Sequence, residues 1–376
     1  MVVRPKLVSL DTATWGNIAR DKDRDGSVQE LITRLSIGDV IPFLSWHHVA
    51  ELAHHGSEKV FNQRVALFRS LPFVAFLKQA QEKAYIGNII DLRNAEISEV
   101  FRDPAADHAT IIERASGRIT NGFASGIGLC RDNEEWWEIY RKNFAKDSQR
   151  RGAEISALLH FPTTDLSEKI FASSQRLRPL DEAQTQFKKM AQTLAQRLKK
   201  DVKKALPNPE FIAQEFMREA YEDGLIMYQD RGTGIEALLK VYGVDRLRLP
   251  KNATVADVGE EAVFIKQLSI NESQFGLPSG SLRQVIKKEM LPSWVVWQGL
   301  SRALLKLPKA ESGNLNDKSI VPFGLYVDRI QVDKRIRDAI RRAAQASNLF
   351  DMLQSKLFKA TDYEGLRMEI DNLAKT

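Results

Sequence analysis

Four acidic residues stand where the chain passes from one expected element to the next. Asp11 and Asp333 each follow a short, mostly apolar run that reads as a β-strand. Glu51 lies in the helix expected after the second strand, and Asp317 stands just before a returning apolar run. Because the carboxyl ends of parallel strands line the crevice in which α/β proteins bind ligands, we expect these side chains to lie close together.

Such a cluster would concentrate negative charge that a bound cation has to offset. Ligands that are all oxygen suit Mg²⁺ or Mn²⁺, which also keep water and take phosphate oxygens as further ligands. The pattern therefore predicts hydrolysis of a phosphodiester with the help of one or two metal ions. In this hypothesis Asp11, Glu51, Asp317 and Asp333 are the catalytic metal ligands, and Mg²⁺ or Mn²⁺ is the cofactor.

The elements that would position these residues alternate between strands and helices at both ends of the chain. Between about residue 77 and about residue 310 the pattern is overwhelmingly helical, and residues 308–316 read as a loop. This arrangement predicts an α/β fold with a central, mostly parallel sheet flanked by helices and interrupted by a large α-helical insertion. Expected elements are strands over residues 6–10, 40–44 and 329–332, and helices around residues 28–35, 46–55, 181–204 and 334–346.

Three segments resemble the PIN-like domain family of nucleases. Residues 317–335 (DKSIVPFGLYVDRIQVDKR) are similar to the closing half of bacterial PIN-like domains, with "YVD" entering a strand and "DKR" ending it. Residues 7–15 (LVSLDTATW) resemble the family's first strand with its first aspartate. Residues 41–56 (IPFLSWHHVAELAHHG) resemble its second strand and glutamate-bearing helix. The resemblance spans roughly residues 5–75 and 312–345.

The resemblance implies a PIN-like sheet and metal-dependent nuclease chemistry by the same four acids. It adds Asp328 as a fifth candidate metal ligand, with a structural role at the entry of its strand as the alternative. One departure is Ile320, which stands where relatives often carry a histidine. The implied division is a discontinuous PIN-like domain (residues 1–76 and 311–376) and a helical insertion domain (residues 77–310).

Basic residues follow Asp333 directly. Net charge is +6, which permits a polyanionic partner. Lys334, Arg335, Arg337 and Arg341 lie on one expected helix and are candidates for contacting a nucleic-acid backbone. With the resemblance, they favour nucleic acid as the partner, RNA more than DNA.

Several classes of protein are excluded or disfavoured. The single cysteine, Cys130, excludes a disulfide within the chain and a four-cysteine zinc site. No run of 18 or more apolar residues occurs, and the N-terminus lacks the layout of a signal peptide. We therefore expect a cytoplasmic protein with no membrane partner.

The leading hypothesis is a metal-dependent nuclease that cleaves RNA, and by analogy a toxin or antiphage defence effector. The insertion would select substrate, bind a regulatory protein or mediate self-association. Two alternatives remain open: a PIN-like module that binds nucleic acid or protein without turnover, and a helical interaction protein in which the acidic spacing is coincidental. Asp11 could also simply cap the following turn, and the histidines that flank Glu51 could serve packing or capping.

Overall fold

The computed structural model describes residues 5–53, 55, 57–79, 86–119, 122–135, 137–139, 141–142, 180–201, 208–215, 217–218, 239–240, 243–249, 253, 255–305 and 313–376. Contacts divide the chain into one unit of residues 1–144 and 284–376 and a second unit of residues 145–283. This division differs from the one that we expected at residues 76 and 311, because helices of residues 89–119 and 292–305 pack on the sheet. All four acidic residues belong to the first unit.

The first unit contains the whole sheet. Its elements before the second unit are β1 (Lys6–Ser9), α1 (Thr12–Asp21), α2 (Gly26–Leu35), β2 (Val40–Leu44), α3 (Trp46–Ala53), α4 (Glu58–Ser70), β3 (Val74–Phe76), α5 (Ile89–Arg102), α6 (His108–Ile119), β4 (Gly122–Ala124) and α7 (Gly126–Asp132). After the second unit come η2 (Lys288–Met290), α15 (Pro292–Leu305), α16 (Gly313–Ile320), η3 (Val321–Leu325), β5 (Arg329–Gln331), α17 (Lys334–Ala343), η4 (Ala344–Ala346), α18 (Leu349–Lys356), β6 (Leu357–Phe358) and α19 (Tyr363–Ala374).

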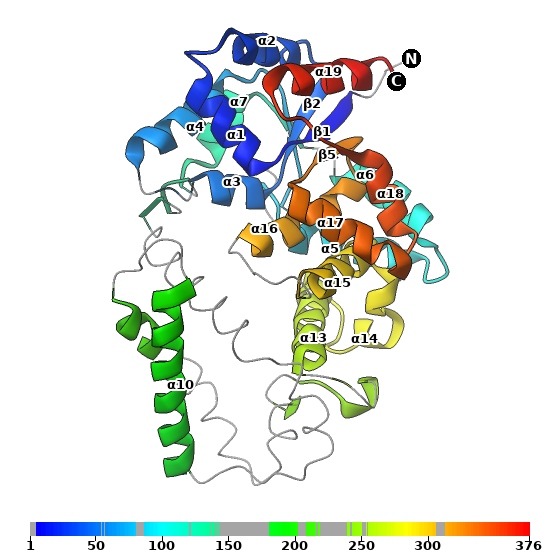
Figure 1. Cartoon of the computed structure of the whole chain (residues 1–376). Helices are drawn as coiled ribbons and strands as arrows, with labels where there is room; N and C mark the ends of the chain where they lie inside the picture. The colour runs from blue at the N-terminus through cyan, green and yellow to red at the C-terminus, as the bar shows by residue number, and fades with distance from the viewer. Residues whose placement is uncertain are drawn as a thin grey trace. The chain divides into compact units, whose positions relative to one another are not determined.

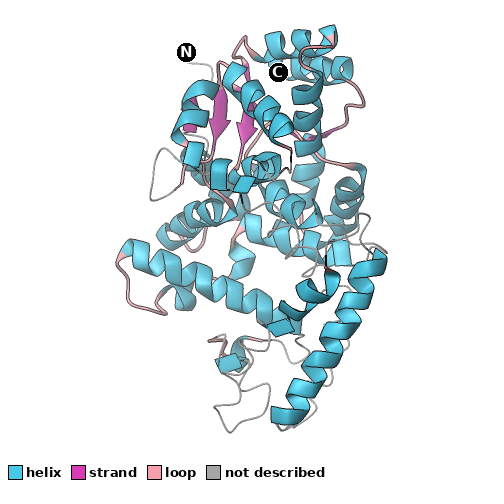
Figure 2. Ribbon diagram, turned by 90° about the vertical axis from the view of Figure 1, so that its left-hand side faces the viewer, coloured by secondary structure: helices cyan, strands magenta, loops and turns pink. Residues whose placement is uncertain are grey.

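The six strands form one mostly parallel sheet in the order β4-β3-β2-β1-β5-β6. Figure 1 labels β2, β1 and β5 of this sheet, and strands are magenta in Figure 2. Only β4 runs antiparallel to its neighbour, β3. From β1 the chain moves outward to β2 and β3, and later returns to place β5 on the other side of β1. The strand order therefore reverses between β1 and β5, and such a switch point opens a crevice at the carboxyl ends of the strands.

Helices cover both faces of the sheet. Side chains alternate along β1, so Leu7 joins a core with α5, α6, α15, α17 and α18, whereas Val8 joins a core with α1, α2, α4, α7 and α19. In β2 Phe43 belongs to the first core and Leu44 to the second. The expected α/β class with a mostly parallel sheet flanked by helices is confirmed.

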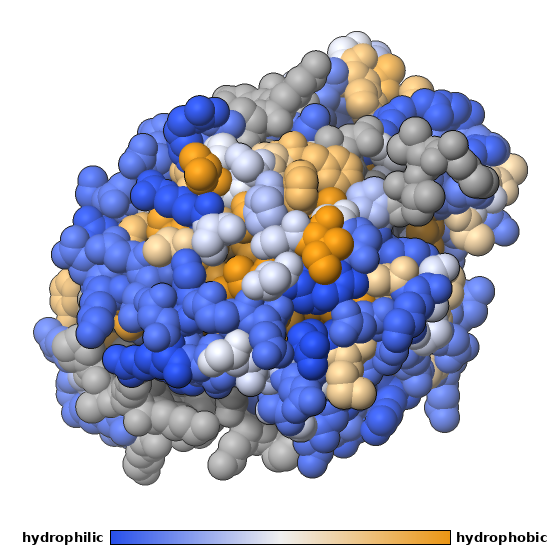
Figure 3. All heavy atoms as spheres, turned by 90° about the horizontal axis from the view of Figure 1, so that it is seen from above, coloured by the Kyte–Doolittle hydropathy of each residue, from blue (hydrophilic) through white to orange (hydrophobic). Residues whose placement is uncertain are grey.

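The surface seen from above is mainly hydrophilic, with hydrophobic groups (orange) lying among hydrophilic ones (Figure 3). Exposed hydrophobic residues of the first unit include Ile37 and Phe73, which are 65% and 46% exposed. Hydrophobic residues exposed singly are normal on a folded protein.

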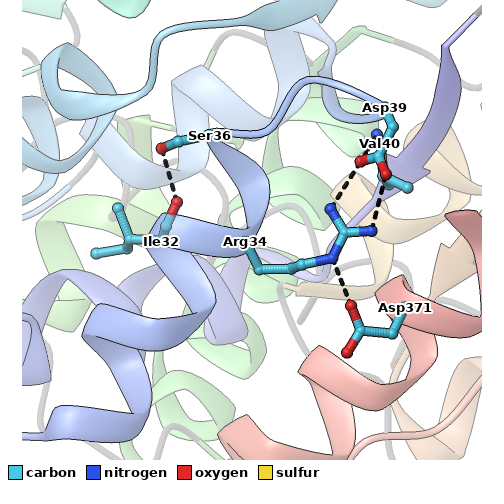
Figure 4. A network of polar contacts seen from close by, with 6 residues as sticks. All are labelled: Ile32, Arg34, Ser36, Asp39, Val40 and Asp371. Atoms are coloured by element: carbon cyan, nitrogen blue, oxygen red, sulfur yellow. Dashed lines mark hydrogen bonds and ion pairs between the residues drawn. The ribbon is translucent and has the colours of Figure 1, made fainter.

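Arg34 of α2 ties the C-terminal helix to the start of β2 (Figure 4). Its Nη1 and Nη2 atoms donate to the two carboxylate oxygens of Asp39, over 2.7 and 3.1 Å, and its Nε atom donates to Asp371 of α19. The Arg34 side chain is only 11% exposed, so this forked ion pair is better shielded than an ordinary surface pair.

The described elements of the second unit are α10 (Leu180–Asp201), η1 (Arg246–Arg248), α13 (Val255–Phe275) and α14 (Leu282–Val285), which crosses the boundary. The amphipathic helix expected over residues 181–204 is therefore present. Its residues Leu194 and Leu198 are buried against Ile212 and Met217. Within the described ranges, no helix combines the length and apolar character needed to cross a bilayer.

A buried carboxyl group joins α5, α15 and η3. Glu96 accepts hydrogen bonds from the Ser293 hydroxyl (2.7 Å), the Ser293 backbone N–H (2.9 Å) and the Tyr326 hydroxyl (2.5 Å). Nearby Arg93 is 3% exposed and stacks on Trp294, 4.2 Å from the ring centroid. Burial raises the pKa of Glu96 to about 7, although its hydrogen bonds and Arg93 oppose the shift.

Glu96→Gln is expected to flatten the pH dependence of stability. In wild type the folded state binds the Glu96 proton more tightly than the unfolded state does. The free energy of unfolding should therefore fall as pH rises from about 4.5 to about 7, by on the order of 3 kcal/mol. Glutamine cannot ionise, so this part of the loss should be absent in urea titrations of the variant. Glu113→Gln, on the exposed side of α6, should keep the wild-type profile.

Candidate metal centre

Asp11 and Asp333 occupy equivalent positions, at the junction of a strand and the helix that follows it. Asp11 is the N-cap of α1 and accepts a hydrogen bond from the Ala13 N–H (3.1 Å). Asp333 is the N-cap of α17 and accepts from the Ile336 N–H (2.6 Å). Aspartate suits these positions because it satisfies a free N–H group and faces the positive end of the helix dipole.

The capping role does not exclude metal binding at either residue. A carboxylate has two oxygens and about four lone-pair sites, so one cap hydrogen bond leaves most of its capacity available. The local interpretation of Asp11 as a cap is thus correct and compatible with the functional one. Both caps also hold their carboxylates in a defined position at the strand ends.

Gln331 links the two strand ends that carry these aspartates. Its Oε1 atom accepts a hydrogen bond from the Asp11 N–H, over 3.3 Å, across the β1–β5 pair. This contact fixes the backbone of Asp11 beside the last residue of β5. A glutamine inside a three-residue strand carries no distinguishing signal in a sequence, so its role was not predicted.

Glu51 and Asp317 come from two helices that pack against each other, α3 and α16. Glu51 is partly buried on α3, which begins directly after β2. Asp317 lies inside α16, not in the polar loop that the sequence suggested. In Figure 1, α3, α16 and α17 are seen at the lower ends of β1 and β5.

The charges of the four carboxylates affect one another. Burial raises the pKa of Asp317 to about 8, and the charges of Glu51, Asp333 and Asp11 add to the shift. Burial likewise raises the pKa of Asp11, with a further contribution from Asp333. Such mutual effects require charges near one another in a poorly solvated place. Glu51, Asp333 and Asp11 therefore lie within electrostatic range of Asp317 near the carboxyl ends of β1 and β5.

Among the described residues, no three His, Cys, Asp or Glu side chains are already spaced as ligands of a single metal ion. Repulsion between like charges opposes closer approach of these carboxylates. Mg²⁺ and Mn²⁺ bind oxygen at about 2.1 Å, so a cation would have to draw the side chains inward by rotation about their χ angles. The donor set is all oxygen, which fits these two ions.

Two histidines near Glu51 form hydrogen bonds with neighbouring strand-end and helix-start groups and are not further acid-cluster members. His48 is fully buried: its Nδ1 atom accepts from the Ser45 N–H (3.0 Å), and its Nε2 atom lies 3.3 Å from the Ser9 hydroxyl. Burial lowers the pKa of His48 to about 4, so the ring is neutral at physiological pH. His48 thus joins the carboxyl ends of β1 and β2.

A second histidine, His47, accepts a hydrogen bond from the backbone N–H of Ile89, at the start of α5, over 3.3 Å. The prediction that these histidines pack or cap is confirmed for His47 and His48. His54 lies outside the described residues.

Asp328 lies away from the acid cluster. Its Oδ2 atom accepts from the Leu7 N–H (2.7 Å), and its own N–H donates to the Leu7 carbonyl (2.9 Å). These bonds place it at the entry of β5, at the end of the strand opposite to Asp333. Asp328 therefore acts as a pairing residue between β1 and β5, which is the structural alternative that the sequence had left open.

The basic residues of α17 differ in their distance from the cluster. Lys334 is exposed beside Asp333, and Arg335 lies close enough to Asp317 to oppose the rise of its pKa. Arg341 lies near the other end of the helix and pairs with Asp338 over 3.6 Å. Arg337 is partly buried between them. The first turn of α17 is thus the basic part of this helix that adjoins the acids.

Comparisons with protein-family models, curated proteins and solved structures found no match to this chain. The strand order, the switch point and the acid cluster are therefore the observations on which a function can be based.

Proposed function

We propose that this protein is a divalent-metal-dependent nuclease of the PIN-like type that cleaves RNA. The observation that carries the proposal is the convergence of Asp11, Glu51, Asp317 and Asp333 from four separate elements at the β1–β5 switch point. Burial and neighbouring like charges raise the pKa of Asp11 and Asp317, so ionising the whole group is unfavourable by itself and favours a bound cation. The parallel strand order with β1 central supports the PIN-like assignment.

In this proposal the four carboxylates hold Mg²⁺ or Mn²⁺, which would polarise a phosphoryl oxygen and lower the pKa of a bound water. The caps of α1 and α17 keep Asp11 and Asp333 in place. Burial and the neighbouring acids raise the pKa of Asp317 to about 8, and a cation would require its deprotonated form because metal ligands must be deprotonated. Lys334 and Arg335 would hold the phosphate backbone beside the metal.

Asp11→Asn is expected to abolish cleavage while leaving the fold intact. Asparagine caps a helix as well as aspartate does but supplies no negative charge to a metal. Purified protein would be incubated with labelled single- and double-stranded RNA and DNA in Mn²⁺, Mg²⁺ or EDTA. Wild type should cut RNA only with metal, with the variant reduced by at least about a hundredfold, or about 3 kcal/mol.

The matched control is Asp25→Asn. Asp25 caps α2 through the N–H two residues on, at 2.9 Å, in the same way as Asp11 caps α1. Cleavage of equal rate by wild type and Asp11→Asn would contradict the proposal. Mn²⁺ binding without cleavage of any substrate would instead favour a module that binds nucleic acid without turnover.

The toxin or antiphage role is an extension of the same activity. Expression of wild type in a bacterial host should slow growth, and expression of Asp11→Asn should not. A regulatory partner or self-association through residues 145–283 would be sought in the same cells by co-purification.

A further inference from the structure

We infer that a cavity beside the acid cluster binds one nucleotide of the nucleic-acid chain, next to the phosphate that is cut. The inference rests on the proposed nuclease function and specifies where its substrate lies. The cavity has a volume of about 330 Å³ and lies between α1, α4 and the segment before α4. The lining residues used below are Gly16, Asn17, Arg20, His55, Gln63 and Arg64.

The cavity adjoins the candidate metal centre on two sides. Ala13, whose N–H is bound by the Asp11 carboxylate, is also part of the cavity wall. Arg64 lies close enough to Glu51 for that charge to favour its protonated form. A ligand in the cavity would therefore be a near neighbour of a phosphate on the metal.

Arg64 is the cationic group that a phosphate would meet. Its Nη1 atom donates to the Leu52 carbonyl over 2.7 Å, and within the described residues it forms no ion pair. Burial lowers the pKa of Arg64 from its ordinary value, yet it stays charged because that value is so high. A charge held by a neutral carbonyl and shielded from water favours an anionic partner.

The Arg64 side chain packs against α1 at Gly16, where no side chain is in the way. A Cβ atom added at Gly16 would lie 3.4 Å from Arg64 Nη2, so the guanidinium lies directly on the helix backbone at this point. Arg20, by contrast, is engaged by Asp21 through two hydrogen bonds of 2.8 Å. Arg64 is therefore the stronger candidate for phosphate, with Arg20 at the outer rim.

The size and the remaining walls indicate a nucleotide and not a bare ion. A volume of this size lies at the lower end of small-molecule sites, which start at about 300 Å³. The side-chain amides of Asn17 and Gln63 each offer donors and an acceptor, which suit sugar hydroxyls and base edges. No acidic side chain is among the residues that line the cavity.

The test uses Gln63→Glu, which keeps the shape of the wall and adds a negative charge. The control is Asn62→Asp, the neighbouring change on α4, because Asn62 is exposed and does not line the cavity. Binding of a fluorescein-labelled single-stranded RNA of roughly ten nucleotides would be measured by anisotropy in EDTA. Gln63→Glu should weaken binding about tenfold and Asn62→Asp less than about twofold.

Arg64→Gln provides an independent variant. It should weaken RNA binding and lower the slope of log affinity against log salt by about 1, the effect of one lost phosphate contact. In cleavage assays with Mn²⁺, Gln63→Glu should raise KM and leave kcat near the wild-type value, because it removes binding common to ground and transition states. Thermal unfolding would check that each variant is folded.

Equal RNA affinity of wild type, Gln63→Glu and Asn62→Asp would overturn the inference. It would also be overturned if uridine monophosphate competed as tightly as the oligonucleotide, since the cavity would then be a site for free nucleotides. Mn²⁺ titration distinguishes a wrong cavity assignment from a wrong nuclease proposal. Gln63→Glu should bind Mn²⁺ as wild type does, whereas a wild type without Mn²⁺ affinity would contradict the function itself.

Discussion

Asp333→Asn is expected to lower metal-dependent RNA cleavage by at least about a thousandfold, which corresponds to about 4 kcal/mol of transition-state stabilisation. Asp333 follows β5 at the switch point, and its charge raises the pKa values of both Asp317 and Asp11. Removing it should abolish metal affinity, which Mn²⁺ titration of the variant would measure alongside the cleavage rate.

The fold should survive this substitution. Asparagine can still accept the hydrogen bond from Ile336 N–H that starts α17. The matched control is Asp362→Asn, because Asp362 caps α19 through the N–H three residues on, at 2.7 Å, in the same geometry. Asp362→Asn should keep full activity. Loss of activity in both variants, or in neither, would contradict a specific role of Asp333.

Asp317→Asn is expected to stabilise the protein in EDTA while removing its response to metal. The folded-state pKa of Asp317 is raised from 3.8 to about 8, so wild type loses stability as pH rises between these values. One pKa unit is worth about 1.4 kcal/mol, so the loss that asparagine avoids amounts to several kcal/mol above about pH 8. The four acids titrate as a coupled group, so the gain is shared among them.

Metal should narrow the difference in stability between wild type and Asp317→Asn. A ligand that binds only the folded state adds about 2.7 kcal/mol at a hundred times its dissociation constant, and Asp317→Asn should lose most of this gain. Urea unfolding of both proteins at about pH 6 and pH 9, with EDTA or Mn²⁺, would measure each contribution. Asp351→Asn, an exposed change on α18, is the control. A variant less stable than wild type in EDTA at alkaline pH would contradict the clustering of the acids.

Periodicity alone predicted the elements that build the switch point. β1, β2, β5, α2 and α17 all lie where apolar alternation or helical spacing placed them. Each has a strong local signal: in α2, for example, Val28, Leu31, Ile32 and Leu35 are all buried. Because strand ends and capping aspartates are local features, the sequence was sufficient to predict Asp11 and Asp333 as neighbours of the crevice.

Elements that depend on tertiary packing were not predicted. β3, β4 and β6 have two or three residues each, too few for any alternation to be visible. The start of α16, residues 313–316, has the composition of a turn, yet it is helical in a segment that packs on α3 and α15. The contact units differ from the expected domains for a related reason. Amphipathic helices such as α5, α6 and α15 do not reveal in their sequence which surface they cover.

The four acids were proposed from the sequence, whereas the residues that contact or adjoin them were missed. The four acids follow from residue type and position, whereas Asp328 was ambiguous because it stands beside a strand like the others. Gln331, His48 and Arg64 act through contacts between residues that are far apart in the chain: Gln331 with Asp11 is the clearest case. No local pattern distinguishes such residues from ordinary polar ones.

The order in which the acids occur along the chain has a consequence during translation. Asp11 and Glu51 are synthesised before residues 145–283, whereas Asp317, β5 and Asp333 are synthesised after them. A nascent chain that stops within this unit carries half of the acid cluster and lacks the strand that completes the switch point. In the proposed nuclease, a chain released within this unit would therefore lack two of the four candidate metal ligands.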